Sequence, residues 1–486
     1  MNGRPASCMP PPARHNEGDD ETVSREAPKR YTSDNDSLHV NRYFPREIGR
    51  LSRSPAWLDA FSIVLITAVS LISFMAWLDN VHINTSNGLW KSVLVRQWKA
   101  DFGAAPLDPS NYLYYPLVSS LCRFLDLLGV ETGQIWRQMA LINTICASIT
   151  IAIVYWMIRR LTGRRDIATV AALFHLGSAF FLSLAIMDED IMPSYMLVLA
   201  AMAMAAVWFS APTAVQIALV AATFTLGWLI EWRMMFPTLP PLLLSLAFSQ
   251  GPTLQRAGRI LFFLAVMLGV VLLIVYLWRG HNGATDVAGL LWTGKGTRTA
   301  WAGFSWHKLG LIVSGMGEYW LGGHFLTGQH RASYSSEWGL AFALQMVLLA
   351  AFILLLWCNR NDSKMRTVAI IFLGTLAAGE LMNAYSQPED PQMQLNVMPW
   401  LTVAAALVLA NLPRSILQSA TIVAAALVLV ALAYNLKTFS ATRGSDGRMQ
   451  AALDELLRLS DPAETIYVYS GMESIVAWHF ATWTPR

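Results

Sequence analysis

The amino-acid sequence predicts an all-α, polytopic membrane protein, and three observations support this prediction. Hydrophobic residues make up 55% of the 486 residues and charged residues only 14%, whereas a soluble domain carries about 25% charged residues. The apolar residues form repeated runs that approach the roughly 20 residues a helix needs to cross a bilayer. Basic and acidic residues are sorted between the connections on alternate sides of these runs. Together these observations exclude a soluble globular domain.

The segment before the first apolar run differs in composition from the rest of the chain. Residues 1–40 are rich in Pro, Asp, Glu, Ser and Asn and nearly free of aliphatic side chains, which is typical of a disordered tail. No apolar core follows a short basic start, so we do not expect a signal peptide. Under the positive-inside rule, four arginines hold this end in the cytoplasm: Arg42, Arg46, Arg50 and Arg53. We therefore expect residues 1–50 to be a disordered cytoplasmic tail.

Residues 51–440 are expected to form one transmembrane domain with about eleven helices. The predicted spans lie at about 57–78, 138–158, 167–186, 191–209, 214–230, 234–249, 260–278, 339–357, 367–382, 396–412 and 416–436. Eleven crossings from a cytoplasmic N-terminus place the C-terminus outside. The connections expected inside carry Arg159, Arg160, Arg164, Arg165, Arg256, Arg259, Arg360, Lys364, Arg366 and Arg414, with Asp166 and Asp362 as their acids. Most other acids fall on the opposite side, so the charges agree with this orientation.

The outer side holds the long connections and the C-terminal segment. Leu89, Val93, Leu94 and Trp98 recur at helical spacing in residues 87–100, among charged residues, which predicts a helix in the plane of the membrane interface. Residues 117–128 could form a second such helix. Residues 441–486 are expected to be a short non-cytoplasmic segment of mixed structure, with a helix at 449–459 and a strand at 465–469. This segment is too small for an independent domain.

Asp79 is the first candidate for chemistry, because it follows the first span directly and lies under the first long outer connection. A carboxylate at the end of a rigid helix is well placed to act as a general base, which must lie within hydrogen-bonding reach of an acceptor hydroxyl. The alternative is a helix-end carboxylate that interacts only with water between lipid headgroups.

Three consecutive acids, Asp188, Glu189 and Asp190, occupy the short outer connection between the third and fourth spans. Charge near the membrane core is costly and usually marks function. Asp188 and Asp190 are spaced so that both could share a hard divalent cation such as Mg²⁺ or Mn²⁺. A solvated acidic turn is the alternative. The four cysteines form no CxxC motif, so neither disulfides nor a thiolate metal site is indicated.

Two further outer segments could contact a substrate. Glu389, Asp390 and Gln392 precede the tenth span, and the N-terminus of a helix favours an anion such as phosphate. An ordinary connecting loop is the alternative. Arg233 follows Glu231 closely between two spans, and it could bind a lipid phosphate or form a plain salt bridge with Glu231.

The layout of residues 57–436 resembles the GT-C superfamily of integral-membrane glycosyltransferases, within it the bacterial group similar to protein O-mannosyltransferases and aminoarabinose transferases. The matching features are an acid after the first span, an amphipathic outer segment, an aromatic-Pro-Leu element, a second acidic motif and a polar loop before a late Pro-containing helix. In this sequence they correspond to Asp79, residues 87–100, Tyr114-Tyr115-Pro116-Leu117, Asp188-Glu189-Asp190 and residues 387–400. Relatives often carry a Lys before Pro-Pro-Leu and an Arg in the late loop, and this chain has neither.

The resemblance implies that a sugar moves from a polyprenyl-phosphate donor to a lipid, glycan or protein acceptor on the non-cytoplasmic face. Asp79 would deprotonate the acceptor, and attack would invert the anomeric carbon. Asp188, Glu189 and Asp190 would orient the sugar or bind a divalent cation, with Tyr115, Arg233 and the late loop as further substrate contacts. The expected partners are this donor, the acceptor and membrane lipids, without nucleic acid, in a bacterial inner membrane.

Two other classes of membrane protein remain as alternatives. A transporter or flippase of a lipid-linked or small polar substrate would place ionisable groups near mid-membrane, often in two repeated halves. Here the acids gather at the outer boundary, and no repeated halves are seen. A polysaccharide polymerase or ligase would rely on Arg and His pairs in its outer loops, whereas the candidate sites here are acidic. The sequence therefore favours a glycosyltransferase, without naming its sugar or acceptor.

Overall fold

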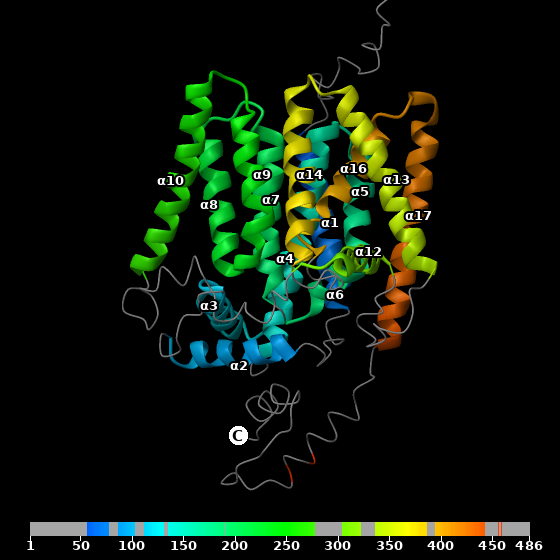
Figure 1. Ribbon diagram of the computed structural model, residues 1–486. Helices are drawn as coiled ribbons and strands as arrows, with labels where there is room; N and C mark the ends of the chain where they lie inside the picture. Colours follow the sequence, from blue (N-terminus) through cyan, green and yellow to red (C-terminus); the bar gives the residue numbers. More distant parts are fainter. Residues whose placement is uncertain are drawn as a thin grey trace, which may run out of the picture. The chain divides into compact units, whose positions relative to one another are not determined.

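The computed structural model describes residues 56–76, 86–102, 111–130, 135–188, 190–277, 304–321, 336–385 and 394–442, with residues 455 and 458 (Figure 1). The expected tail at 1–50 and the strand at 465–469 lie outside these residues, as does most of the helix expected at 449–459. All of the described residues belong to one compact unit, Glu47–Arg486.

The described residues form helices and no strands. In chain order the helices are α1 (Ala56–Met75), α2 (Ser86–Ala100), α3 (Tyr114–Leu127), α4 (Ile135–Thr162), α5 (Arg165–Leu176), α6 (Ala179–Ile186), α7 (Ile191–Trp208), α8 (Ala214–Ile230), the 3₁₀ turn η5 (Trp232–Met234), α9 (Met235–Ala247), α10 (Thr253–Leu277), α12 (Trp306–Trp320), α13 (Ser336–Cys358), α14 (Ser363–Asn383), α16 (Pro399–Ala410) and α17 (Arg414–Thr442). The all-α prediction is confirmed for these residues.

The chain is an integral membrane protein, but the expected eleven spans are not confirmed. Seven described helices are long and apolar enough to cross a membrane, namely α1, α4, α7, α10, α13, α14 and α17. The span expected at 167–186 is the pair α5 and α6, bent by 70°, which gives up to eight spans if counted as one. The segments expected at 214–230, 234–249 and 396–412 are the helices α8, α9 and α16, of 17, 13 and 12 residues. A 12-residue helix rises about 18 Å, short of the roughly 30 Å hydrocarbon core.

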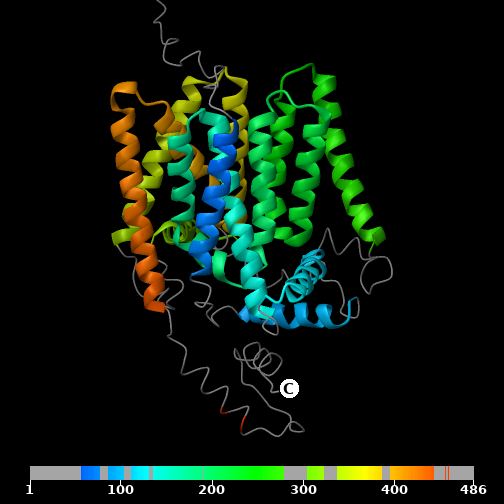
Figure 2. The same cartoon turned by 180° about the vertical axis from the view of Figure 1, so that it is seen from behind.

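The long helices stand side by side around α4, with α10 and α17 at opposite edges (Figure 1). Helix α4 packs against α1, α5 and α7, and the view from behind shows α1 lying along it (Figure 2). At one end, the turns that join α4 to α5 and α13 to α14 carry the arginines expected in the cytoplasm. The other end carries α2, α3 and α12, which lie across the bundle (Figure 1). We call this second end the outer end.

Helices α7 and α8 are packed closely, and their contact places two acids together. A Cβ atom built on Gly227 would lie 2.8 Å from Val198 Cγ2 and 3.2 Å from the carbonyl oxygen of Ser194. Small residues permit such close approach between membrane helices, and Ser194 Oγ donates a hydrogen bond to Gly227 O at 2.7 Å. Because the two helices are antiparallel neighbours, the residue before α7 lies beside the residue after α8. These residues are Asp190 and Glu231.

Helix α2 is fixed to α3 and α4 by an ion pair and an amide. Lys99 Nζ lies 2.5 Å from Asp126 Oδ2 on α3, and Gln138 Nε2 of α4 donates to Asp126 Oδ1 at 2.7 Å. The buried face of α2 includes Lys91, Val95 and Trp98, which recur at spacings of four and three residues. Lys91 therefore points into the protein, rather than sharing an exposed charged face with the other basic residues of α2.

Candidate functional site

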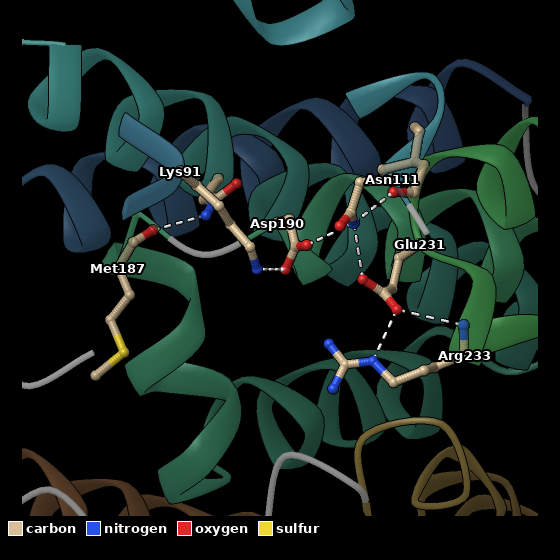
Figure 3. Close-up of polar contacts among 8 residues, drawn as sticks. Lys91, Asn111, Met187, Asp190, Glu231 and Arg233 are labelled. Atoms are coloured by element: carbon tan, nitrogen blue, oxygen red, sulfur yellow. Dashed lines mark hydrogen bonds and ion pairs between the residues drawn. The ribbon is translucent and has the colours of Figure 1, made fainter. Parts of the chain in front are cut away.

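Five polar residues meet at the outer end of the bundle, and we call them the outer polar cluster: Lys91, Asn111, Asp190, Glu231 and Arg233. In the same order, they come from α2, the segment just before α3, the start of α7, the end of α8 and η5. Figure 3 shows Lys91 and Asn111 approaching Asp190, with Arg233 directed at Glu231. Residues separated by more than a hundred positions in the sequence are thus brought to one place.

Asp190 is fully buried and occupies the N-cap position of α7, where its side chain makes no capping hydrogen bond. Its Oδ1 lies 2.5 Å from Lys91 Nζ, and its Oδ2 accepts a hydrogen bond from Asn111 Nδ2 at 2.6 Å. A buried carboxylate is tolerated when it is paired and hydrogen-bonded, and the positive end of a helix dipole favours it further. Asp190 is therefore built to hold a negative charge inside the protein.

Glu231 is also buried, at 2% exposure, but it caps the C-terminus of α8, where the helix dipole disfavours an anion. Arg233 Nε donates to its Oε1 at 2.7 Å. This confirms the salt bridge that the sequence offered as one interpretation of Arg233. Asn111 Nδ2 donates to the other carboxyl oxygen, Oε2, at 2.9 Å.

Asn111 joins the two acids through a single amide nitrogen. Besides the two carboxyl groups, its Nδ2 donates to the carbonyl oxygen of Ile230 at 3.0 Å. An amide nitrogen carries two hydrogens, so they are shared among three oxygens. Nearby, the backbone N–H of Leu113 donates to Leu229 O at 2.8 Å. The segment before α3 thus satisfies the last carbonyl groups of α8, which have no partner within the helix.

The two acids differ in how firmly they hold a proton. For Asp190, burial favours the neutral form, but the charges of Lys91 and Arg233 outweigh it and lower the pKa. For Glu231, burial raises the pKa, and the nearby Asp190 charge adds to this effect although Arg233 opposes it. Two adjacent carboxyl groups with pKa values pushed apart are typical of sites that handle protons.

A pH-dependent stability follows from the raised pKa of Glu231. Because its unfolded value is about 4.5, its contribution to stability is fully present below that pH and is lost as the pH rises through the folded pKa. Asp190 acts in the opposite direction, but only below about pH 4. Between pH 4.5 and 8, we expect the unfolding temperature of wild type to fall relative to that of Glu231→Gln, which cannot ionise. A constant difference across this range would contradict the raised pKa.

The structure brings together only some of the residues predicted from the sequence. Asp190 and Arg233 belong to the outer polar cluster. Asp188 is fully buried two positions earlier, and Asn143 Nδ2 of α4 holds the preceding Met187 carbonyl at 2.6 Å. Tyr115 is buried in the first turn of α3, edge-on to Tyr114 with ring centroids 5.4 Å apart. The predicted site residues Asp79, Glu189, Glu389, Asp390 and Gln392 lie outside the described residues, and their roles stay predictions.

Sequence reasoning did not single out Lys91 or Asn111. For Lys91 a signal exists, since it precedes Val95 by four residues and Trp98 by seven, and so shares their helix face. For Asn111 there is none, because its importance depends on contacts with residues 79 and 120 positions away.

An apolar groove associated with the described helices lies elsewhere. It is a groove of about 660 Å³ between α5, α13, α16 and α17, with Trp320 and Leu321 at the end of α12 among its lining residues. Its lining contains no charged side chain and no residue of α2, α3, α7 or α8. Among the described residues, the outer polar cluster is therefore a better candidate for a functional site than this groove.

Comparison with known proteins identifies the fold. No protein-family model matches the sequence, and no curated protein is significantly similar to it. Among solved structures, the chain is similar to ArnT from Cupriavidus metallidurans bound to undecaprenyl phosphate, with 14% identity, a TM-score of 0.56, and coverage of 86% of this chain and 84% of that one. The same protein in the apo state matches with a TM-score of 0.60 at the same identity and coverage. ArnT is a GT-C aminoarabinose transferase, so the GT-C-like fold expected from the sequence is confirmed.

Proposed function

We propose that this protein is a membrane glycosyltransferase that moves a sugar from a polyprenyl-phosphate donor to an acceptor on the non-cytoplasmic face. The observation that carries the proposal is the outer polar cluster, where two acids and two cations are assembled beside α2 and α3. The GT-C-like fold supports it, because ArnT has this fold and its solved structure binds undecaprenyl phosphate.

Lys91 and Arg233 are the proposed binding groups for the donor phosphate. Charge-assisted hydrogen bonds from ammonium and guanidinium groups are the strong contacts for phosphate. Lys91 is 8% exposed, and the Arg233 side chain is 29% exposed. Because each cation already contacts a carboxylate, it is held in place before the donor arrives. Lys91 thus supplies, from α2, the cation that the sequence lacks before its Tyr-Pro-Leu element.

Asp79 is the proposed base, as the resemblance implies. The acceptor hydroxyl would attack the anomeric carbon while its proton passes to Asp79. The bond from that carbon to the phosphate oxygen would break, and the polyprenyl phosphate would leave with the bonding electron pair. Asp188, Glu189 and Asp190 would orient the sugar, with Tyr115, Glu389, Asp390 and Gln392 as further contacts. We also propose a bacterial inner membrane location with the N-terminus inside and the C-terminus outside.

A divalent cation at Asp188 and Asp190 stays a prediction, and the described residues do not favour it. Both oxygens of Asp190 already face nitrogen donors, Lys91 Nζ and Asn111 Nδ2. No three His, Cys, Asp or Glu side chains gather as a cation site among the described residues. We therefore give the cation no step in the reaction.

The test is a transfer assay with the full chain reconstituted in liposomes. Undecaprenyl-phosphate sugars serve as donors, bacterial membrane extract supplies the acceptor, and formation of free undecaprenyl phosphate is measured. We expect turnover with at least one donor, and a loss of at least about 100-fold in Asp79→Asn, the usual size of general-base catalysis. A matched control is Asp166→Asn, which removes an acid at the opposite end of the bundle.

Three outcomes would contradict parts of this proposal. The absence of turnover with every donor would contradict the proposed glycosyltransferase activity. Full activity in Asp79→Asn would contradict the role of Asp79 as the base. Activity that is unchanged by EDTA would exclude the divalent cation predicted at Asp188 and Asp190. Mass spectrometry of surface glycans, from cells with and without the protein, would then identify the sugar and the acceptor.

A further inference from the structure

A second group of polar side chains lies where α14 ends and α16 begins. Glu380 and Asn383 are three residues apart and so share one face of α14, while Gln394 and Asn396 precede α16. Asn383 and Gln394 are fully buried, and Asn396 is 6% exposed. The amide nitrogens Asn383 Nδ2 and Gln394 Nε2 each lie 3.4 Å from Glu380 Oε2. These contacts are at the long limit of a hydrogen bond, so the carboxyl group is only loosely held.

Several polar atoms of this group are shielded from solvent without a hydrogen-bond partner among the described residues. They include Glu380 Oε1, Asn396 Oδ1 and the indole nitrogen of Trp400, four residues after Asn396. A polar atom that is buried without a hydrogen-bond partner destabilises the folded state. An acid inside a membrane-spanning helix is rare and usually marks a functional site. A polar ligand that hydrogen-bonds to these atoms would offset this cost.

The group lies on the same side of the bundle as the outer polar cluster. Gly379 lets the chain before α16 approach α14, since a Cβ atom built on Gly379 would collide with Val397 and would lie 3.4 Å from Pro237 Cβ. Pro237 belongs to the first turn of α9, four residues after Arg233. Gly379, the neighbour of Glu380, thus lies against a residue four positions after the proposed phosphate-binding Arg233.

The chemistry of the group fits hydroxyl groups better than an ion. It offers acceptors, Glu380 Oε1 and Asn396 Oδ1, together with an N–H donor, Trp400 Nε1. A hard cation takes only oxygen ligands, and an anion takes only donors. A hydroxyl group both donates and accepts, so a ligand with several hydroxyls can satisfy both kinds of atom.

We propose that Glu380, Asn383, Gln394 and Asn396 form a subsite for the hydroxyl groups of the donor sugar, next to the phosphate-binding residues. This inference rests on the proposed function, since a lipid-linked sugar would reach both places at once. The phosphate would lie at Lys91 and Arg233, and the sugar would extend toward α14 and α16. Recognition of the sugar would then be separable from recognition of the lipid phosphate.

Two lipid probes separate the subsites: undecaprenyl phosphate alone, and undecaprenyl phosphate linked to glucose, galactose, mannose or 4-amino-4-deoxyarabinose. Apparent Kd is measured by thermal shift of the full chain in nanodiscs. We expect at least one sugar-bearing lipid to bind wild type about tenfold more tightly than undecaprenyl phosphate. Glu380→Gln weakens a charged hydrogen bond to a neutral one, so it should remove about tenfold of that preference. Asn396→Leu should also reduce it, with little change in the Kd for undecaprenyl phosphate.

Thr367→Val is the matched control, because Thr367 is buried at the opposite end of the same helix, and it should keep the preference. The subsite is overturned if wild type shows no preference for any sugar-bearing lipid, or if both variants keep it. It is also overturned if the variants weaken undecaprenyl phosphate and sugar-bearing lipids equally, which would indicate a structural role alone. If wild type binds neither undecaprenyl phosphate nor any sugar-bearing form of it, the proposed function itself fails. The two failures are thereby distinguished.

Discussion

The Lys91→Met variant is expected to lose at least about 100-fold in transfer and about 3–5 kcal/mol in stability, because removing one partner of a buried ion pair leaves an uncompensated charge. Methionine keeps most of the length of the side chain, so the change tests the ammonium group rather than the volume. Lys91 contacts Asp190 at 2.5 Å, with side-chain exposures of 11% and 1%. The measurements are donor turnover in liposomes and thermal unfolding in nanodiscs.

A double variant separates the two effects. Asp190→Asn added to Lys91→Met removes the stranded charge, so stability should recover toward wild type while transfer should not. Arg96→Met is the matched control, since Arg96 is exposed on the same helix, and such surface changes are usually within about 0.5 kcal/mol. Transfer within a few fold of wild type in Lys91→Met would show that Lys91 does not bind the donor.

The Asn111→Asp variant is expected to be as damaging as Lys91→Met, although asparagine and aspartate side chains have nearly the same shape. Asn111 Nδ2 donates to Asp190 Oδ2, Glu231 Oε2 and Ile230 O. Aspartate has no hydrogen to donate when ionised, and it would add a third carboxyl group to two buried ones. Leaving buried acceptors unsatisfied costs about 1–3 kcal/mol each, so we expect a loss of several kcal/mol and at least about 100-fold in transfer.

The pH dependence identifies the cause of this loss. Protonation of the new carboxyl group restores a donor, so the unfolding temperature of Asn111→Asp should approach that of wild type at low pH. Asn411→Asp is the control, because the amide of Asn411 also donates to a carbonyl oxygen, Leu407 O at 2.8 Å, but at the opposite end of the bundle. Equal losses in the two variants at neutral pH would show that the bridging contact of Asn111 has no special importance.

The site shows which predictions can be made from local patterns. Three consecutive acids next to an apolar run indicated a functional motif, because such charge is costly at a membrane boundary, and the structure shows that Asp190 of this motif is buried. The pair Glu231 and Arg233 was also visible, since two positions in one short turn can reach each other. Lys91 was only one of the charged residues in the predicted interfacial segment 87–100, yet it is buried. An amphipathic pattern gives the direction of side chains around a helix, but not which face meets the protein.

The eleven apolar segments likewise fixed where helices form, but not how far each extends. Every expected span coincides with a helix or a pair of helices, because apolar composition favours helix in a membrane. The span expected at 167–186 is instead broken at Gly177 and Ser178, where Ser178 has extended backbone angles. Buried Asn435 of α17 donates to Gly177 O at 2.6 Å, so a partner distant in sequence satisfies this break.

By itself, the sequence determined that the chain is a helical membrane protein, where its helices lie, and that acids gather beside their ends. These properties depend on composition and on neighbours within a few positions, so they can be read along the chain. Only the tertiary structure decided which acid meets which cation. The close contact at Gly227 brings the start of α7 to the end of α8. Lys91 of α2 then contacts Asp190, and Asn111 contacts both Asp190 and Glu231. Such contacts depend on side-chain packing between helices far apart in sequence, and no local pattern encodes them.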